Sequence, residues 1–170
     1  MNKFIILILT IFVSFPAYAF QADIEQVCFP PGCERAIIQQ IDNAKIEIKV
    51  QAYSFTSAPI AKALLNAHKR KVDVQIILDK SQKKKSYSSY TFFQNQGIPA
   101  YIDFTHAIAH NKIIIIDRET VITGSFNFTK AAENKNAENL LIIKSQELAK
   151  TYIDNWQKHK NHSDPYSGRE

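Results

Sequence analysis

The segment from His110 to Asn127 constrains the fold of this chain most, because its pattern predicts a β-hairpin. The predicted hairpin has three parts: a strand over residues 111–116, a turn over 117–120 and a returning strand over 121–123. The first strand is β-branched, and alternation along it directs His110 and Lys112 to the same side. The returning strand then brings Ser125 and Asn127 back beside His110.

An imidazole, an ammonium, a hydroxyl and a carboxamide are therefore expected around one point, and this set is suited to a phosphodiester. Displacement at phosphorus is in line, so a nucleophile approaches one face while a proton donor serves the leaving oxygen on the opposite face. One histidine cannot occupy both places, although imidazole can act as base or acid near neutral pH. Because the pattern occurs once, the second histidine is expected from another subunit.

The same residues resemble a known family signature. They read His110-x-Lys112-x4-Asp117-x6-Gly124-Ser125-x-Asn127, which is similar at every position and spacing to the signature of the phospholipase D superfamily. Two further segments, 52–56 and 124–139, look like the compact bacterial nucleases of that superfamily. The resemblance extends from about Cys33 to the C-terminus.

The resemblance implies a metal-independent phosphodiesterase with one composite site in a two-fold homodimer. His110 of one subunit would form a phosphohistidine, while His110 of the other protonates the leaving oxygen and then activates water. Lys112 and Asn127 from both subunits would bind the non-bridging oxygens. Ser125 would help to fix the strand turn and the phosphate.

Three further residues complete the expected site. Glu138 is expected against the second ring nitrogen of His110, where it would fix the tautomer and stabilise imidazolium; the alternative is a solvated surface glutamate. Asp117 is expected to be structural, because it lies at the far end of the strand from His110. Gly124 is expected to let the backbone approach the phosphate closely; the alternative is an ordinary turn glycine.

Residues 1–19 predict a signal peptide and export to the periplasm or the medium. Lys3 precedes an apolar run over 4–15, and residues 17–19 fit a small-x-small cleavage site. The run is short for a bilayer span, which needs roughly 20 residues, so no stable membrane span is expected. The mature domain would be 20–170, and loss of Lys3 lowers the formal net charge from +5 to +4. A basic domain attracts nucleic acid or anionic lipid, although the charge also fits ordinary solubility.

The chain has two cysteines, Cys28 and Cys33, which bracket the sequence Phe-Pro-Pro-Gly. In an exported protein this pair predicts a disulfide. A zinc site on these cysteines is disfavoured, because tetrahedral zinc requires further ligands. No carboxylate cluster or Cys/His set has ligand spacing in the sequence, so neither a metal nor another cofactor is expected.

The rest of the chain predicts a single α/β domain, an α/β/α sandwich in which helices flank a mixed β-sheet. Expected helices cover residues 34–44, 57–70, 87–96 and 147–158, and expected strands cover 45–52, 72–78, 100–102 and 140–143. A strand, a helix and a second strand follow one another at 45–78, which predicts a βαβ unit.

Two sets of aromatic residues are expected to have different roles, one at the surface and one in the core. The lysine run 83–85 with Tyr87 and Tyr90 predicts phosphate-binding charge beside rings that can stack on bases, with a solvated loop as the alternative. Phe126 and Phe128 are expected in the core, because they alternate with the expected site residues.

The remaining histidines are not expected to bind metal. His106 and His110 stand four apart, but the segment runs into a strand and lacks the glutamate of the helical zinc motif. His106 is therefore expected to be a loop histidine near the cleft. The other three, His68, His159 and His162, show no convergent partners in the sequence.

These features favour a low-specificity, metal-independent endonuclease acting on DNA or RNA. The alternative is a lipid phosphodiesterase that releases phosphatidic acid from phospholipid. A third hypothesis is a non-catalytic nucleic-acid-binding module, but such a module would have no need for both His110 and Glu138. The sequence does not select among DNA, RNA and phospholipid.

Overall fold

The computed structural model describes residues 21–83 and 89–165. The expected signal peptide lies outside these residues, as do Lys84, Lys85 and Tyr87 of the lysine-tyrosine loop. Within the described part of the chain, no helix is long and apolar enough to cross a membrane.

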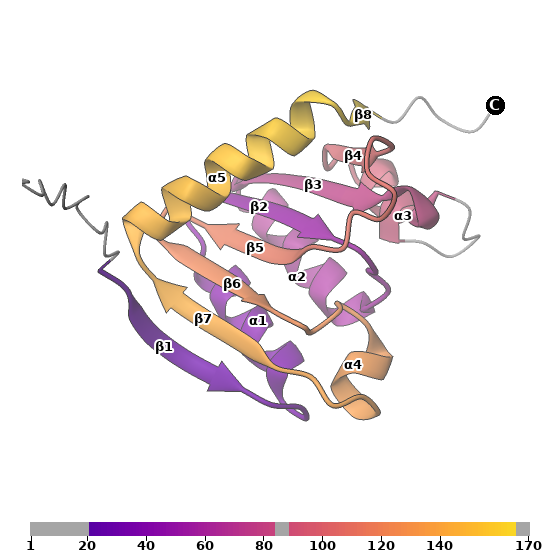
Figure 1. The fold of residues 1–170 in the computed structure, drawn as a ribbon. Coiled ribbons are helices and arrows are strands. Elements are labelled where there is room, and N and C mark those ends of the chain that lie inside the picture. Colours follow the sequence, from indigo (N-terminus) through magenta and orange to yellow (C-terminus); the bar gives the residue numbers. More distant parts are fainter. Residues whose placement is uncertain (1–20, 84–88, 166–170) are drawn as a thin grey trace, which may run out of the picture.

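The structure is a mixed β-sheet with helices on both faces (Figure 1). Its strands are β1 (Asp23–Cys28), β2 (Glu47–Ala52), β3 (Asp73–Asp79), β4 (Ala100–Asp103), β5 (Lys112–Ile116), β6 (Thr120–Gly124), β7 (Leu140–Lys144) and β8 (Asp164–Pro165). Its helices are α1 (Cys33–Asn43), α2 (Ala58–Lys69), the 3-10 turn η1 (Lys80–Gln82), α3 (Ser89–Asn95), α4 (Lys130–Asn134) and α5 (Gln146–Asn161).

The described strands form one sheet in the order β1-β7-β6-β5-β2-β3-β4-β8. β2, β3 and β4 are parallel neighbours, and the other pairs are antiparallel. The parallel pair β2 and β3 is joined through α2, which confirms the predicted βαβ unit. The predicted α/β class with a mixed sheet is therefore confirmed.

Two cores lie on the two faces of this sheet. In Figure 1, α5 crosses one face while α1 and α2 lie behind the other. The larger core, between the sheet and the helices α1 to α3, contains Phe55, Phe126 and Phe128, so the prediction for the last two is confirmed. The smaller core lies under α5, where Trp156 is buried and donates from Nε1 to the carbonyl oxygen of Val50 at 2.9 Å.

Local sequence signals account for the element boundaries that position the site. Ser57 caps α2, since its hydroxyl accepts from the backbone N–H of Ile60 at 3.2 Å. The turn between β5 and β6 places Asp117 at φ 52 and Arg118 at φ 59, and two successive positive φ values suit the twist of a tight hairpin. The predicted hairpin is therefore present.

Several features differ from the sequence predictions. Strand β1, the two-residue strand β8 and the short helix α4 were not expected. Tyr90 is buried in the larger core, so its predicted role as an exposed stacking ring is wrong. The disulfide between Cys28 and Cys33 is formed, as predicted, and it joins the end of β1 to the start of α1.

Candidate functional site

The signature residues gather at one end of the sheet, where β2 and β6 end and β5 and β7 begin (Figure 1). Lys112, the first residue of β5, pairs with Ala52 at the end of β2. Gly124, the last residue of β6, pairs with Leu140 at the start of β7. The antiparallel hairpin thus brings both flanks of the signature to the same edge.

The side chain of Lys112 contacts the backbone of His110. The Lys112 Nζ donates to the carbonyl oxygen of His110 at 2.8 Å. Tyr53 lies against both side chains: its ring centroid is 4.6 Å from that of His110, and the Lys112 Nζ lies 5.2 Å from it. Tyr53 was not predicted as a site residue, although it directly follows Ala52, the partner of Lys112 in the sheet.

The ammonium of Lys112 is held in a partly desolvated position. The residue is only 7% exposed, and burial lowers its pKa, while the negative charge of Glu138 opposes this effect. Removal of water strengthens the attraction between an ammonium and an anion. Lys112 is therefore well placed to bind a phosphate oxygen that enters at this edge.

Ser125 and Glu138 form a hydrogen-bonded pair beside the hairpin. The Ser125 hydroxyl donates to Glu138 Oε2 at 2.6 Å and accepts from the backbone N–H of Asn139 at 3.0 Å. The other oxygen of Glu138 accepts from Asn136 Nδ2 at 3.0 Å. Among the described residues no hydrogen bond joins Glu138 to the His110 ring, and the role of Glu138 toward His110 stays a prediction. The carboxylate oxygens are instead engaged by neighbours in the same loop, and the exposed His110 ring lies on Tyr53.

Asn127 is fixed by the phenylalanines on either side of it. Phe126 and Phe128 are buried, and the carbonyl oxygen of Phe128 accepts from the backbone N–H groups of Thr56 and Ser57, both at 2.9 Å. Asn127 Oδ1 is buried without a hydrogen-bond partner in the described part of the chain. A buried polar atom without a partner is unusual. The NH₂ group at the other end of the carboxamide is the donor from which a phosphate oxygen could accept.

Gly124 allows a close approach between two backbone segments. Its φ is +148, and an added Cβ would collide with the backbone carbonyl oxygen of Asn139. That carbonyl also accepts from the backbone N–H groups of Ser125 and Phe126 at 3.1 and 3.3 Å. The glycine lets β6 pass the residue that precedes β7, and its approach to a phosphate stays a prediction.

Asp117 lies at the opposite end of β5 from Lys112. Its carboxylate accepts backbone N–H bonds from Lys45, Ile46 and Glu47, which tie the hairpin turn to the start of β2. These contacts give Asp117 a structural function away from the expected chemistry.

A pocket of about 420 Å³ adjoins the site and shares Tyr53 with it. Lys80, Lys83, Phe104 and Ile108 contribute to its lining. The Lys83 Nζ lies 5.4 Å from the centre of the Phe104 ring, and Phe104 is 40% exposed. The pocket therefore offers cations and an accessible aromatic ring next to His110.

Three other histidines gather around one carboxylate, and one of them, His106, lies in the loop before His110 as predicted. His106, His159 and His162 all direct a ring nitrogen at one oxygen of Asp103. The prediction that His159 and His162 lack convergent partners is wrong, because their partner Asp103 lies 56 and 59 residues earlier in the chain.

Comparison with known proteins identifies related chains. Residues 37–160 match the family described as "Cardiolipin synthase, PLD-like domain". A phospholipase D of Rickettsia conorii is 50% identical over 135 residues, which cover 78% of this chain and 68% of the relative. The mitochondrial cardiolipin hydrolase of Xenopus laevis is 28% identical over 129 residues, which cover 76% of this chain and 61% of the relative.

A solved structure has the same fold over nearly the whole described chain. Nuc from Salmonella typhimurium, a phospholipase D family member, is 40% identical and superposes with a TM-score of 0.82. The superposition covers 87% of this chain and 100% of Nuc.

Proposed function

Because the chain belongs to the phospholipase D superfamily and is a phosphodiesterase, we propose that it is a metal-independent endonuclease of low sequence specificity. The pocket beside His110 is the observation that favours nucleic acid over lipid as the substrate. Lys80 and Lys83 can contact a phosphate backbone, and the exposed ring of Phe104 can stack on a base. Stacking and phosphate contacts do not distinguish base sequence, so low specificity follows.

In the proposed reaction a ring nitrogen of His110 attacks phosphorus and forms a P–N bond as the bond to the leaving oxygen breaks. His110 of the partner subunit gives its proton to that oxygen and then takes a proton from water, and the hydroxide displaces the histidine. Lys112 and Asn127 bind the non-bridging oxygens and stabilise the negative charge that grows in the transition state. The position of Lys112, whose partly desolvated ammonium lies beside His110, supports its role.

The homodimer is supported by the arrangement of the other histidines. His106, His159 and His162 are occupied by Asp103, and His68 is in the last turn of α2. No other imidazole of the described chain contacts the His110 ring, which lies against Tyr53. A second copy supplies the missing acid if His110 lies near a two-fold axis.

A substrate panel tests the nuclease proposal. Purified protein is incubated with labelled single-stranded DNA, duplex DNA, RNA and vesicles of phosphatidylcholine or cardiolipin, all with excess EDTA. Cleavage of nucleic acid with negligible lipid turnover is expected. Turnover of lipid alone would reject the endonuclease.

A lysine variant sharpens this test. Lys83→Ala should weaken binding of single strands and reduce the dependence of binding on salt, because a phosphate contact is lost. Lys69→Ala removes the same charge from the far end of α2 and should have little effect. Equal effects of the two substitutions would reject the pocket as the nucleic-acid site.

The lipid phosphodiesterase is the second candidate, and two observations favour it. Phe104 and Ile108 are exposed apolar side chains at the pocket, where they could enter a lipid interface. The relative from Rickettsia conorii bears the name phospholipase D. In this case Phe104→Ala would lower turnover of vesicles more than turnover of a short water-soluble phosphodiester.

Mixing experiments test the composite site. Wild-type and His110→Ala chains are unfolded together, refolded and assayed at constant total protein. A composite site requires two intact subunits, so activity should follow the square of the wild-type fraction. A linear dependence, or full activity of a species shown by sedimentation to be a monomer, would reject the model.

We also propose that the protein is exported to an oxidising compartment. The disulfide between Cys28 and Cys33 supports it, since such bonds persist mainly outside the reducing cytosol. Alkylation of the thiols in freshly lysed cells, before and after reduction, measures whether the bond exists in the cell.

A further inference from the structure

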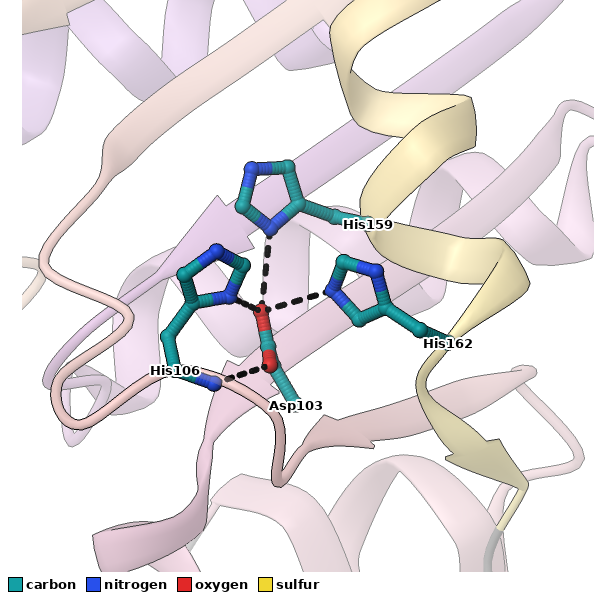
Figure 2. Close-up of side chains that lie close together, drawn as sticks. All are labelled: Asp103, His106, His159 and His162. Atoms are coloured by element: carbon teal, nitrogen blue, oxygen red, sulfur yellow. Dashed lines mark hydrogen bonds and ion pairs between the residues drawn. The ribbon is translucent and has the colours of Figure 1, made fainter.

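Four side chains from two distant segments converge beside the end of α5 (Figure 2). Asp103 is the last residue of β4, and His106 lies in the loop that follows. His159 is in the last turn of α5, and His162 is its C-cap residue. One possible ligand atom from each of the four lies within 4.8 Å of all the others.

The carboxylate of Asp103 is completely buried and its two oxygens have different partners. Oδ1 accepts from the backbone N–H groups of Thr105 at 3.0 Å and His106 at 3.2 Å. Oδ2 faces three imidazole nitrogens: His106 Nδ1 and His159 Nδ1 at 2.9 Å, and His162 Nε2 at 3.4 Å. Backbone bonds thus fix the orientation of the carboxylate and leave Oδ2 directed at the imidazoles.

Hydrogen bonding alone does not require this arrangement. A carboxylate oxygen has two lone pairs, so three imidazole donors around Oδ2 exceed its capacity. The rings also lie close to one another, with centroid separations of 4.7, 5.2 and 5.3 Å. A cation between the four ligand atoms would engage all of them at once.

The observed distances suit a tetrahedral transition metal. Zinc binds nitrogen and carboxylate oxygen at about 2.0–2.2 Å, which separates the ligand atoms of a tetrahedron by roughly 3.3–3.5 Å. The distance from Oδ2 to His162 Nε2, 3.4 Å, matches this value, and the two distances of 2.9 Å would lengthen by about 0.4–0.6 Å around an ion. The partly exposed rings of His106 and His162 can rotate to close the remaining edges and give a metal ion access from solvent.

We propose that Asp103, His106, His159 and His162 bind one Zn²⁺ ion as a structural site. Four protein ligands leave no open position for substrate, which is the arrangement of structural rather than catalytic zinc. The ion would fasten the end of α5 to the loop that leads to His110. This site shares no residue with the catalytic signature, so the proposal is independent of the endonuclease and of its metal-free chemistry.

Direct metal binding tests the proposal. The purified chain is stripped with a chelator, exchanged into metal-free buffer and titrated with ZnCl₂ by calorimetry, with metal content measured by mass spectrometry. One zinc per chain is expected. At a free zinc concentration about 100 times Kd, Tm should rise by about 5–10 °C. Substitution with Co²⁺ should give the strong visible absorption of tetrahedral coordination.

Two matched variants identify the ligands. His162→Ala removes a partly exposed ligand at a helix end and is expected to fold, as circular dichroism without metal would verify. It should weaken zinc binding roughly 100-fold or more, because one of four ligands is lost. His68→Ala removes a histidine of α2 outside the cluster and should bind zinc as the wild type does. Binding below one ion per five chains, or equal binding by both variants, would overturn the proposal.

Discussion

Replacement of Asp117 should reduce stability without affecting the chemistry, although this residue belongs to the signature. Its carboxylate accepts from the backbone N–H groups of Lys45 at 2.8 Å, Ile46 at 2.7 Å and Glu47 at 3.0 Å. These bonds hold the β5–β6 turn against the start of β2, at the other end of β5 from Lys112.

The size of the effect follows from these contacts. A hydrogen bond to a charged group contributes about 1.5–3 kcal/mol, and exposure to solvent reduces this to roughly 0.5–1 kcal/mol for each bond. Three bonds then give about 2 kcal/mol. Asp117 also has φ 52, where alanine is disfavoured by about 1 kcal/mol. Asp117→Ala should therefore cost about 3 kcal/mol, which lowers Tm by about 6–12 °C in a domain of this size.

Asp117→Asn provides the matched control. It keeps the oxygen that binds Ile46 and Glu47 and tolerates a positive φ, so it should cost about 1 kcal/mol. Thermal unfolding followed by circular dichroism measures both variants, and kcat/KM at 25 °C should stay within about threefold of wild type. A Tm within about 2 °C of wild type for Asp117→Ala would refute the reasoning. Loss of turnover in the folded variant would instead assign Asp117 to the chemistry.

Three other substitutions test other parts of the structure. His110→Ala should lower turnover below about a hundredth of wild type, since acid-base groups contribute about 10²–10⁴, and residual activity above that would remove His110 from the mechanism. Gly124→Ala should cost about 3 kcal/mol on denaturant unfolding, because its Cβ meets the Asn139 carbonyl; an unchanged midpoint would contradict the close approach. Replacing Cys28 and Cys33 by serine should cost about 2 kcal/mol for so short a loop, and an equal stability of reduced and oxidised protein would argue against this contribution.

The central elements could be predicted because their signals are local. Strand β5 is a run of isoleucines after Lys112, and the start of α2 has a capping serine followed by proline. Strand β1 escaped prediction because its residues are exposed except Cys28, so it lacks the alternation of a half-buried strand. It is held by pairing with β7, a contact between residues more than a hundred positions apart.

Part of the site could be predicted because its residues are close together in the sequence. His110, Lys112, Ser125 and Asn127 lie on one hairpin, so their proximity follows from strand alternation and a short turn. The histidine cluster could not be found in this way. It needs β4 and α5 side by side, and no spacing in the sequence indicates which histidine meets which carboxylate.

Two buried aspartates bind the loop that precedes His110. Asp79 and Asp103 end the adjacent parallel strands β3 and β4 and are direct partners in the sheet. Asp79 accepts from the backbone N–H of Ala109 at 2.8 Å, while Asp103 accepts from the backbone and the ring of His106. The loop before His110 is therefore anchored at both ends.

Because this loop is anchored at His106 and Ala109, the segment between them is held in place at both ends. Ile108 in this interval is 58% exposed and lines the pocket. The same anchors therefore determine the position of the pocket wall and that of His110, which follows Ala109 directly. In the proposed composite site two copies of His110 meet across phosphorus, so a displacement of this loop would shift both copies. In the proposed reaction the buried carboxylates would thus act through position, although neither belongs to the signature.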